Sequence, residues 1–253
     1  MWSGLQQRCE FDHSLPECSV QRALTASRAT LGRQMAAEVV ELEVRGVVVG
    51  LFQENCWIVG SRRRGEACVI DPGDEPEEIL ALARDMGVQI TRVVASHAHL
   101  DHIMAARAIV EATGAPFLLH ESDLPIAENM PLSARMWLGH DVPPAPPPDA
   151  FPTDGQDLEI AGLTMRVIHT PGHTPGSLCL YAADAHLLFS GDTLFRESIG
   201  RTDLPGGNTE QILRSISQRL FALPDDTRVL PGHMQETTIA HERAHNPFVR
   251  LAR

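Results

Sequence analysis

Apolar and polar residues alternate along this chain in patterns that predict strands first and then a helix. Four short apolar stretches, VVELEV, GVVVGLF, NCWIV and ACVID, are separated by Gly46, Gly60 and the turn-rich segment 62–65, so we expect a meander of strands. From residue 76 to residue 86 the apolar side chains fall on one helical stripe, and Gly87 follows where a helix would be capped.

The pattern continues with a strand at 91–96, a helix at 102–113 that Gly114 closes, and a strand at 116–120. Residues 121–152 lose this rhythm and end in proline-dense sequence, which is typical of an irregular surface loop. Such a loop can form a lid, which Met130, Met136 and Trp137 would either line or pack beneath.

A second run of strands follows the loop and indicates the fold class. Strands are expected at 157–161, 163–170, 177–183, 186–191 and 227–231, with a helix near 210–221 and a short terminal helix. Runs of strands and helices that repeat in two halves predict an α/β fold in which two sheets are sandwiched between helices.

The N-terminal segment differs from the rest of the chain. Residues 1–34 show no sustained period, and patterned sequence begins only after Met35. We therefore interpret 1–34 as a peripheral extension and 35–253 as a single domain, which suits a chain of 253 residues. Glu10, Asp12 and Glu17 argue against a transit peptide, and Met35 as the natural start remains an alternative.

Composition excludes several classes of function. A net charge of −12 disfavours a nucleic-acid partner, because phosphate contacts dominate that affinity. The sequence contains no lysine, which excludes Schiff-base chemistry. Its 5 cysteines form no C-x-x-C pair, so we expect a reducing compartment, the cytoplasm. No apolar run approaches the ~20 residues that span a bilayer, so we expect no membrane partner.

One short segment concentrates the side chains that bind metals. His97, His99, Asp101 and His102 directly follow a predicted buried strand. Imidazole nitrogen and carboxylate oxygen are ligands of divalent metals such as zinc. Spacing by two directs His97 and His99 to one side, while a turn at Asp101 can aim the other pair at a neighbouring point, so we predict two adjacent ions. The alternative, a group of surface histidines, would leave this clustering without a reason.

Three later segments repeat this arrangement. Each places one ligand-type residue after a glycine, just beyond a predicted strand: His173 in Thr-Pro-Gly-His-Thr, Asp192 in Ser-Gly-Asp-Thr and His233 in Leu-Pro-Gly-His. A single Gly-His or Gly-Asp pair is typical of ordinary turn chemistry. Together with the first segment, these three complete a set of seven candidate ligands.

The order H-x-H-x-D-H, T-P-G-H-T, G-D and P-G-H resembles the metallo-β-lactamase superfamily from about residue 38 to the end. Segments 200–208 and 237–248 further resemble the short glyoxalase II-like hydrolases, relatives of hydroxyacylglutathione hydrolase. The resemblance implies an αβ/βα four-layer sandwich. It also implies a first metal on His97, His99 and His173, a second metal on Asp101, His102 and His233, and Asp192 as a bridge between the two.

The chain departs from the family pattern beside these ligands. Ser96 stands where threonine is usual, Met104 and Ala105 stand where glycine is common, and Met234 follows His233 where glycine is expected. These departures keep every ligand but change the expected rim of the pocket. No cysteine falls in a ligand motif, which points away from antibiotic hydrolysis.

The resemblance implies a hydrolase with two divalent ions, zinc first and iron or manganese as alternatives. Such ions lower the pKa of a shared water, so that metal-bound hydroxide can attack a carbonyl. A thiolate leaves with little acid assistance, so a small-molecule thioester such as a hydroxyacylglutathione suits the site. Asp101 would orient the hydroxide, and Arg201 could bind a substrate carboxylate unless it merely pairs with Asp203.

Other activities remain open within the same superfamily. A persulfide dioxygenase would use one iron on the residues matching His97, His173 and Asp192. The 204–208 and 231–233 segments look more like the short hydrolases, which favours hydrolysis. A non-catalytic or redox relative is disfavoured because all seven ligands are present, and a nuclease would need a basic surface.

Overall fold

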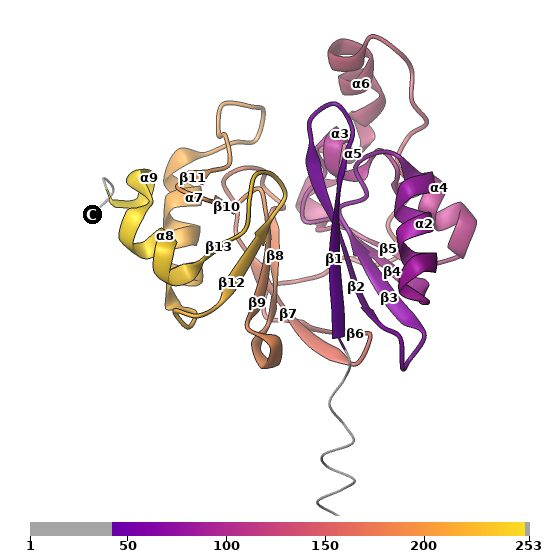
Figure 1. The fold of residues 1–253 in the computed structure, drawn as a ribbon. Coiled ribbons are helices and arrows are strands. Elements are labelled where there is room, and N and C mark those ends of the chain that lie inside the picture. Colours follow the sequence, from indigo (N-terminus) through magenta and orange to yellow (C-terminus); the bar gives the residue numbers. More distant parts are fainter. Residues whose placement is uncertain (1–41, 251–253) are drawn as a thin grey trace, which may run out of the picture. The chain divides into compact units, whose positions relative to one another are not determined.

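The computed structural model describes residues 42–250, so the expected N-terminal extension lies outside the described residues and the division at residue 35 stays a prediction. Two large sheets lie face to face (Figure 1). The first has the strand order β1 (Leu42–Val49), β2 (Glu54–Ser61), β3 (Glu66–Ile70), β4 (Gln89–Val94) and β5 (Phe117–Leu118).

The second sheet has the order β13 (Thr237–Thr238), β12 (Arg228–Pro231), β9 (Leu187–Gly191), β8 (Leu178–Ala182), β7 (Leu163–His169) and β6 (Asp157–Ile160). A separate hairpin joins β10 (Leu194–Phe195) to β11 (Ser198–Ile199). The segments predicted as strands are therefore found in both sheets, although VVELEV and GVVVGLF contribute to one strand, β1, and the strand expected at 116–120 is only two residues long.

Helices cover the outer face of each sheet (Figure 1). Beside the first sheet lie α2 (Pro76–Met86), α3 (Leu100–Ile103), α4 (Ala106–Thr113), α5 (Leu124–Glu128) and α6 (Met130–Leu138). Beside the second sheet lie α7 (Thr209–Arg214), α8 (Ile239–His245) and α9 (Pro247–Arg250). Within residues 42–250, no helix is both long enough and apolar enough to cross a membrane.

Strand alternation produces the layers. In β3, Ala67 and Val69 face the core beneath α2 and α4, whereas Cys68 faces the core between the sheets. In β8, Leu180 faces the core between the sheets, whereas Cys179 faces the core beneath the C-terminal helices. Strands buried on both faces read as continuous apolar runs, which is how they stand in the sequence. The four-layer αβ/βα sandwich is confirmed.

Parallel pairing brings the functional loops to one edge of each sheet. β3 pairs parallel with β4, so Asp71 and His97 both follow the carboxyl ends of their strands. β9 pairs parallel with β12, so Asp192 and His233 do the same in the second sheet. Ligands in open α/β sheets bind at such carboxyl ends.

Two predicted turns are wrong. Gly46 and Gly60 lie inside β1 and β2 rather than between strands. A Cβ at Gly46 would lie 2.8 Å from Cζ3 of Trp57 on the paired strand. This glycine therefore marks a close side-chain approach across the sheet and not a change of direction.

The loop predicted at 121–152 is wrong in its first half, which folds into α5 and α6. Pro125 and Pro131 stand in the first turns of these helices, where a missing N–H costs nothing. Met130 is buried in the core, whereas Met136 and Trp137 are exposed. The proline-dense second half is irregular, as predicted, and its role as a lid stays a prediction.

Other element boundaries differ less. α2 spans the predicted residues and ends at Gly87, whose φ of 69° forms the cap. The helix predicted at 102–113 is divided into α3 and α4, because the N–H of Ala105 donates to the carbonyl of Pro72. Near the C-terminus, α7 passes into a wider turn at Ser215–Arg219 and a tight turn at Leu220–Ala222 instead of continuing as one helix.

Candidate metal centre

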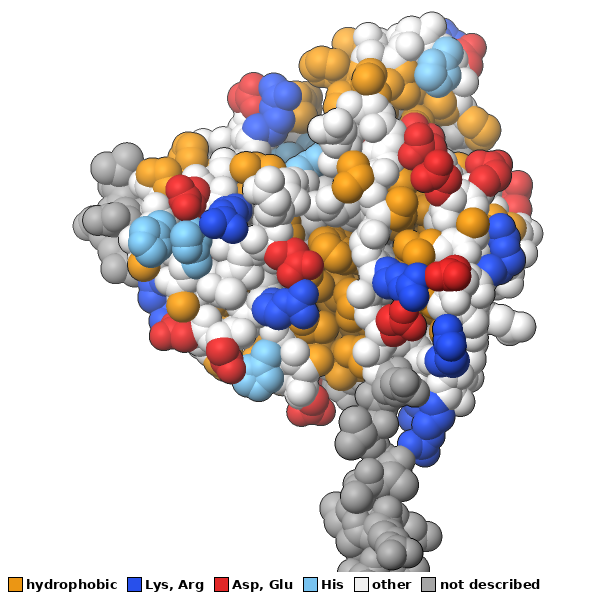
Figure 2. All heavy atoms as spheres, viewed as in Figure 1, with side chains coloured by type: hydrophobic (Ala, Val, Ile, Leu, Met, Phe, Trp, Pro, Cys, Tyr) orange, Lys and Arg blue, Asp and Glu red, His pale blue; other side chains and the backbone are white. Residues whose placement is uncertain are grey.

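The structure brings all seven candidate ligands to one place from loops that are distant in sequence. His97 and His99 lie between β4 and α3, and Asp101 and His102 lie in α3 itself. The other three, each beyond the end of a strand of the second sheet, are His173, Asp192 and His233. In the space-filling view, histidine atoms are visible at the bottom of a recess at the upper edge (Figure 2).

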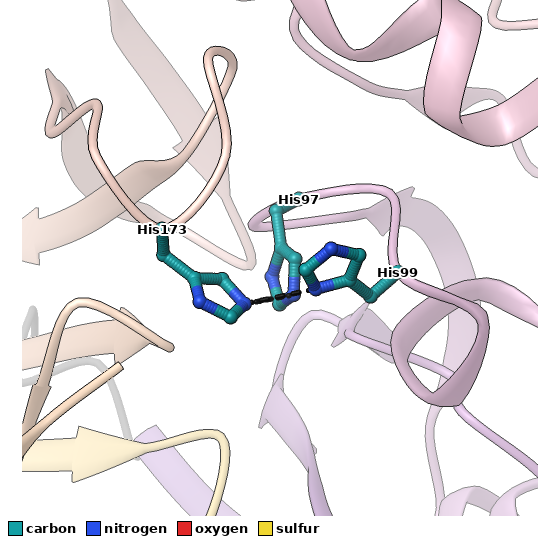
Figure 3. A group of neighbouring side chains, drawn as sticks. All are labelled: His97, His99 and His173. Atoms are coloured by element: carbon teal, nitrogen blue, oxygen red, sulfur yellow. Dashed lines mark hydrogen bonds between the residues drawn. The ribbon is translucent and has the colours of Figure 1, made fainter. Parts of the chain in front are cut away.

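Three imidazole rings form the first group. Figure 3 shows His97 and His99 from the first half of the chain converging with His173 from the second half. Nε2 of His173 lies 2.9 Å from Nδ1 of His99 and 3.2 Å from Nε2 of His97. The three ring nitrogens therefore point at a common centre that a metal ion can occupy.

A second group lies beside the first. Oδ2 of Asp101 lies 3.3 Å from Nε2 of His233 and 3.9 Å from Nε2 of His102. His102 is fully buried, whereas the other two side chains are about a fifth exposed, at 19% and 21%. The second group is therefore the more open of the two, and a small molecule can approach it from solvent.

Asp192 stands between the two groups. Its Oδ1 lies 3.4 Å from Nε2 of His102, and its Oδ2 lies 3.5 Å from Nε2 of His173. The same Oδ2 lies 3.7 Å from Nε2 of His233. One carboxylate thus presents an oxygen to a member of each group.

The protonation of two first-group histidines and the lack of partners at two other atoms fit a metal site. Burial lowers the pKa of His97 well below its ordinary value and that of His99 to about 3, so both rings are neutral and can ligate a metal. Within residues 42–250, Nε2 of His102 and Oδ1 of Asp192 are buried without a hydrogen-bond partner. Buried polar atoms are normally satisfied, and a cation between these groups would satisfy them.

The nitrogens that face away from the centre are held by other residues. Nδ1 of His173 donates to the backbone carbonyl of Arg201 at 2.7 Å, and Nδ1 of His97 lies 3.0 Å from the hydroxyl of Ser96. Nδ1 of His102 lies 3.1 Å from Oδ2 of Asp71. Such partners fix the ring orientation of ligating histidines.

The sequence analysis missed Asp71 but contained a signal for it. Asp71 follows the buried strand β3, just as Asp192 follows β9, and a Pro-Gly turn comes next. Its carboxylate also accepts hydrogen bonds from the backbone N–H and the hydroxyl of Ser96. The serine at this position thus supplies the hydroxyl that the usual threonine would supply.

The glycine before His233 has a steric cause. A Cβ at Gly232 would lie 2.5 Å from Oδ1 of Asp192 and 2.6 Å from Cε1 of His102. Any other residue would push these two side chains out of place. The Pro-Gly-His order is therefore a requirement of the site and not only of a turn.

The two residues expected to act on substrate differ in their setting. Burial opposes ionisation of Asp101, but His102 and His233 outweigh it and lower the pKa of this carboxyl, which is ionised at neutral pH. Arg201 is exposed, and its guanidinium makes two hydrogen bonds of 2.8 Å to the carboxylate of Asp203. The ion pair that the sequence left open is thus present at the rim.

Comparison with known proteins agrees with this geometry. The model of the metallo-beta-lactamase superfamily matches residues 49–233, which include all seven ligands. This chain belongs to the metallo-β-lactamase superfamily. The superfamily binds divalent metal, so this member is a metal-dependent hydrolase whose histidine and aspartate cluster fits such ions.

Several relatives align with this chain over nearly their whole length. Hydroxyacylglutathione hydrolase GloC of Haemophilus influenzae is 31% identical over 209 residues, 82% of this chain and 98% of GloC. The structure of TTHA1623 in a di-iron-bound form is 40% identical, with a TM-score of 0.74 over 81% of this chain and 99% of that one. The B3 metallo-beta-lactamase BLEG-1 is 35% identical, with a TM-score of 0.77 over 82% and 99%. A hydroxyacylglutathione hydrolase and a metallo-beta-lactamase are thus both similar to this chain.

Proposed function

We propose that this chain hydrolyses small-molecule thioesters with two divalent ions, and that hydroxyacylglutathione thioesters are the first substrates to test. The observation that carries the proposal is Asp192, whose two oxygens face two separate groups of three ligand side chains. The similarity to the hydroxyacylglutathione hydrolase GloC and to the di-iron-bound TTHA1623 supports it.

Each of the two ligand groups would hold one ion. His97, His99 and His173 would hold the first ion, and Asp101, His102 and His233 would hold the second, with Asp192 shared. Imidazole and carboxylate donors suit zinc, and they also suit iron or manganese. We propose zinc as the resident metal.

When bound, two divalent ions supply Lewis acidity that lowers the pKa of water and polarises a carbonyl. Asp101 is ionised and partly exposed, so its carboxylate can accept a hydrogen bond from the attacking water and orient it. Asp71 and the Arg201 carbonyl hold His102 and His173 in position, which keeps the reacting geometry fixed.

The leaving group decides between a thioester and an amide. An amine must be protonated as it leaves, so an amide needs more acid assistance than a thioester. A thiolate, with a thiol pKa near 8.5, leaves without that help. Thioesters are therefore favoured over β-lactam amides as substrates.

Arg201 is the proposed contact for the anionic end of the substrate. It lies on the rim, directly after Gly200, and its backbone carbonyl touches His173. A guanidinium can bind a carboxylate in a bidentate manner, as it already does with Asp203. The carboxylates of glutathione could exchange with Asp203 for this position.

The 5 cysteines without a C-x-x-C pair support a reducing location, so we propose the cytoplasm. The net charge of −12 disfavours nucleic acid as a partner.

The test is a substrate panel with the full chain loaded with zinc or with iron. We expect hydrolysis of S-lactoylglutathione to exceed that of a chromogenic cephalosporin, with no oxygen consumed when glutathione persulfide is supplied. Oxygen uptake by a protein that holds one iron would contradict the proposal and indicate a persulfide dioxygenase. Preferred cleavage of the cephalosporin would contradict it in favour of a β-lactamase.

A further inference from the structure

Asp123 is a fully buried carboxylate outside the ligand set. It ends the short turn Glu121–Asp123 between β5 and α5, and its relative exposure is 0%. The two residues before it, Glu121 and Ser122, are exposed. The sequence gives no sign that Asp123 is buried while its two neighbours are exposed.

Its hydrogen bonds reach two of the loops that carry ligands. Oδ2 accepts the backbone N–H of Ala98 at 3.0 Å and the hydroxyl of Thr174 at 2.8 Å. Oδ1 accepts the backbone N–H of Gly176 at 2.6 Å. Ala98 lies between His97 and His99, and Thr174 follows His173, so one side chain spans all the loops of the first ligand group.

The loop that follows His173 contacts this carboxylate through a glycine. A Cβ at Gly176 would lie 2.6 Å from Oδ1 of Asp123, so the loop reaches the carboxylate only because this residue is glycine. Thr174 is bonded further to Ser177, whose hydroxyl also accepts the N–H of Thr174. The contact is therefore part of a connected buried network.

We propose that Asp123 is a positioning residue that fastens the His97–His99 loop to the His173 loop and thereby sets the affinity of the first metal site. The inference rests on the proposed function only in that it takes these histidines as metal ligands. Supporting groups of this kind fix ligand geometry, and losing one weakens metal binding about 10- to 100-fold.

Replacement of Asp123 by asparagine tests the proposal, because asparagine has one acceptor oxygen where aspartate has two. Both carboxylate oxygens accept a backbone N–H, one from Ala98 and one from Gly176. An Asp123→Asn side chain has a single oxygen, so in either rotamer its NH2 group faces an N–H donor. The substitution preserves size and breaks the bridge between the loops.

The experiment titrates metal-free full-length protein with zinc against a chromogenic chelator. We expect wild type to bind two ions, and Asp123→Asn to bind one of them about 10- to 100-fold more weakly while the other is unchanged. His99→Ala, which removes a first-group ligand, identifies which ion is lost. Thr174→Val should weaken the same ion less, and Thr174→Ser, which keeps the hydroxyl, should restore it.

Asp149→Asn is the matched control, because Asp149 accepts the N–H of Phe117 through Oδ2 and asparagine can still do so. Unchanged zinc affinity in Asp123→Asn and Thr174→Val would overturn the inference. Equal weakening of both ions together with a lower melting temperature of the metal-free variant would overturn it in favour of a purely structural role. If Asp123→Asn does not fold, Thr174→Val decides alone.

The proposed function can fail separately. Wild-type protein that binds two zinc ions but does not cleave thioesters would refute the substrate and leave the role of Asp123 intact. Wild-type protein that binds no zinc would overturn both.

Discussion

At the scale of single residues, the metal ligands were predictable because each stands in a recognisable motif, whereas two carboxylates that hold the ligand loops were not identified. His97, His99, Asp101 and His102 stand within six positions, so the sequence alone shows them as a group. Asp71 and Asp123 reach the same loops through hydrogen bonds that span 25 and 25 to 53 residues. The place of Asp71 after a buried strand was a signal in the sequence, whereas the contacts of Asp123 are shown only by the folded structure.

Substitution of Asp192 tests whether one carboxylate is shared by two metal ions. Its carboxylate faces both ligand groups, so Asp192→Ala should lose both ions and the thioesterase activity, as measured by elemental analysis of the purified protein. Asp184→Ala, an exposed aspartate in a surface turn, is the control and should keep both ions. Full metal content in Asp192→Ala would show that this carboxylate is not shared.

Substitution of Arg201 tests whether this side chain binds the substrate. If it binds a glutathione carboxylate, Arg201→Ala should raise KM for S-lactoylglutathione roughly tenfold with kcat little changed, because it removes binding common to ground and transition states. Its backbone carbonyl, which holds His173, is unaffected by this substitution. Arg196→Ala, another exposed arginine, is the control, and equal KM values in both variants would leave Arg201 as a structural ion pair only.

At the scale of elements, the helix with a clear apolar stripe was predicted well, whereas short helices without a sustained period were not. The bounds of α2 were predicted correctly because the spacing of its apolar residues and the capping position of Gly87 agree. α5 and α6 were missed because residues 121–152 lose the periodic pattern, although Pro125 and Pro131 stand where proline is favoured, in the first turn of a helix. β1 was divided at Gly46 because the space that Trp57 needs is invisible in sequence.

Two methionines of α6 test how this region packs. Met130 is 1% exposed and Met136 is 74% exposed, although both were expected either to line or to underlie a lid. Met130→Ala should cost 2 to 5 kcal/mol, on the order found for buried large-to-small changes. Met136→Ala should change stability by less than about 0.5 kcal/mol. Urea unfolding measures both, and similar costs for the two variants would contradict the packing described.

At the scale of the whole molecule, the site joins the two halves of the fold. Four of the ligands come from the first half, and His173, Asp192 and His233 come from the second, so a bound ion links one sheet to the other. The sequence predicted the two halves and their ligands. It did not predict the order of the strands within each sheet or the parallel pairing of β3 with β4 and of β9 with β12, because these depend on contacts between distant segments.

Metal removal should therefore lower global stability. Ions at 100 times their Kd contribute about 2.7 kcal/mol per site, and roughly 2 to 4 °C of melting temperature follows from each kcal/mol at this size. With two sites, a chelator should thus lower the Tm of wild type by roughly 10 to 20 °C. The same chelator should leave the Tm of Asp192→Ala unchanged, and an equal fall in both proteins would mean that the chelator acts elsewhere.

The central claim is that two ions share Asp192 and together support thioester hydrolysis. Its most direct test is a zinc titration of metal-free protein in which bound metal and S-lactoylglutathione hydrolysis are followed together. The account predicts that activity rises until two equivalents of zinc are bound and that no oxygen is consumed with a persulfide. Full activity at one equivalent of metal, or oxygen uptake with one iron per chain, would contradict it.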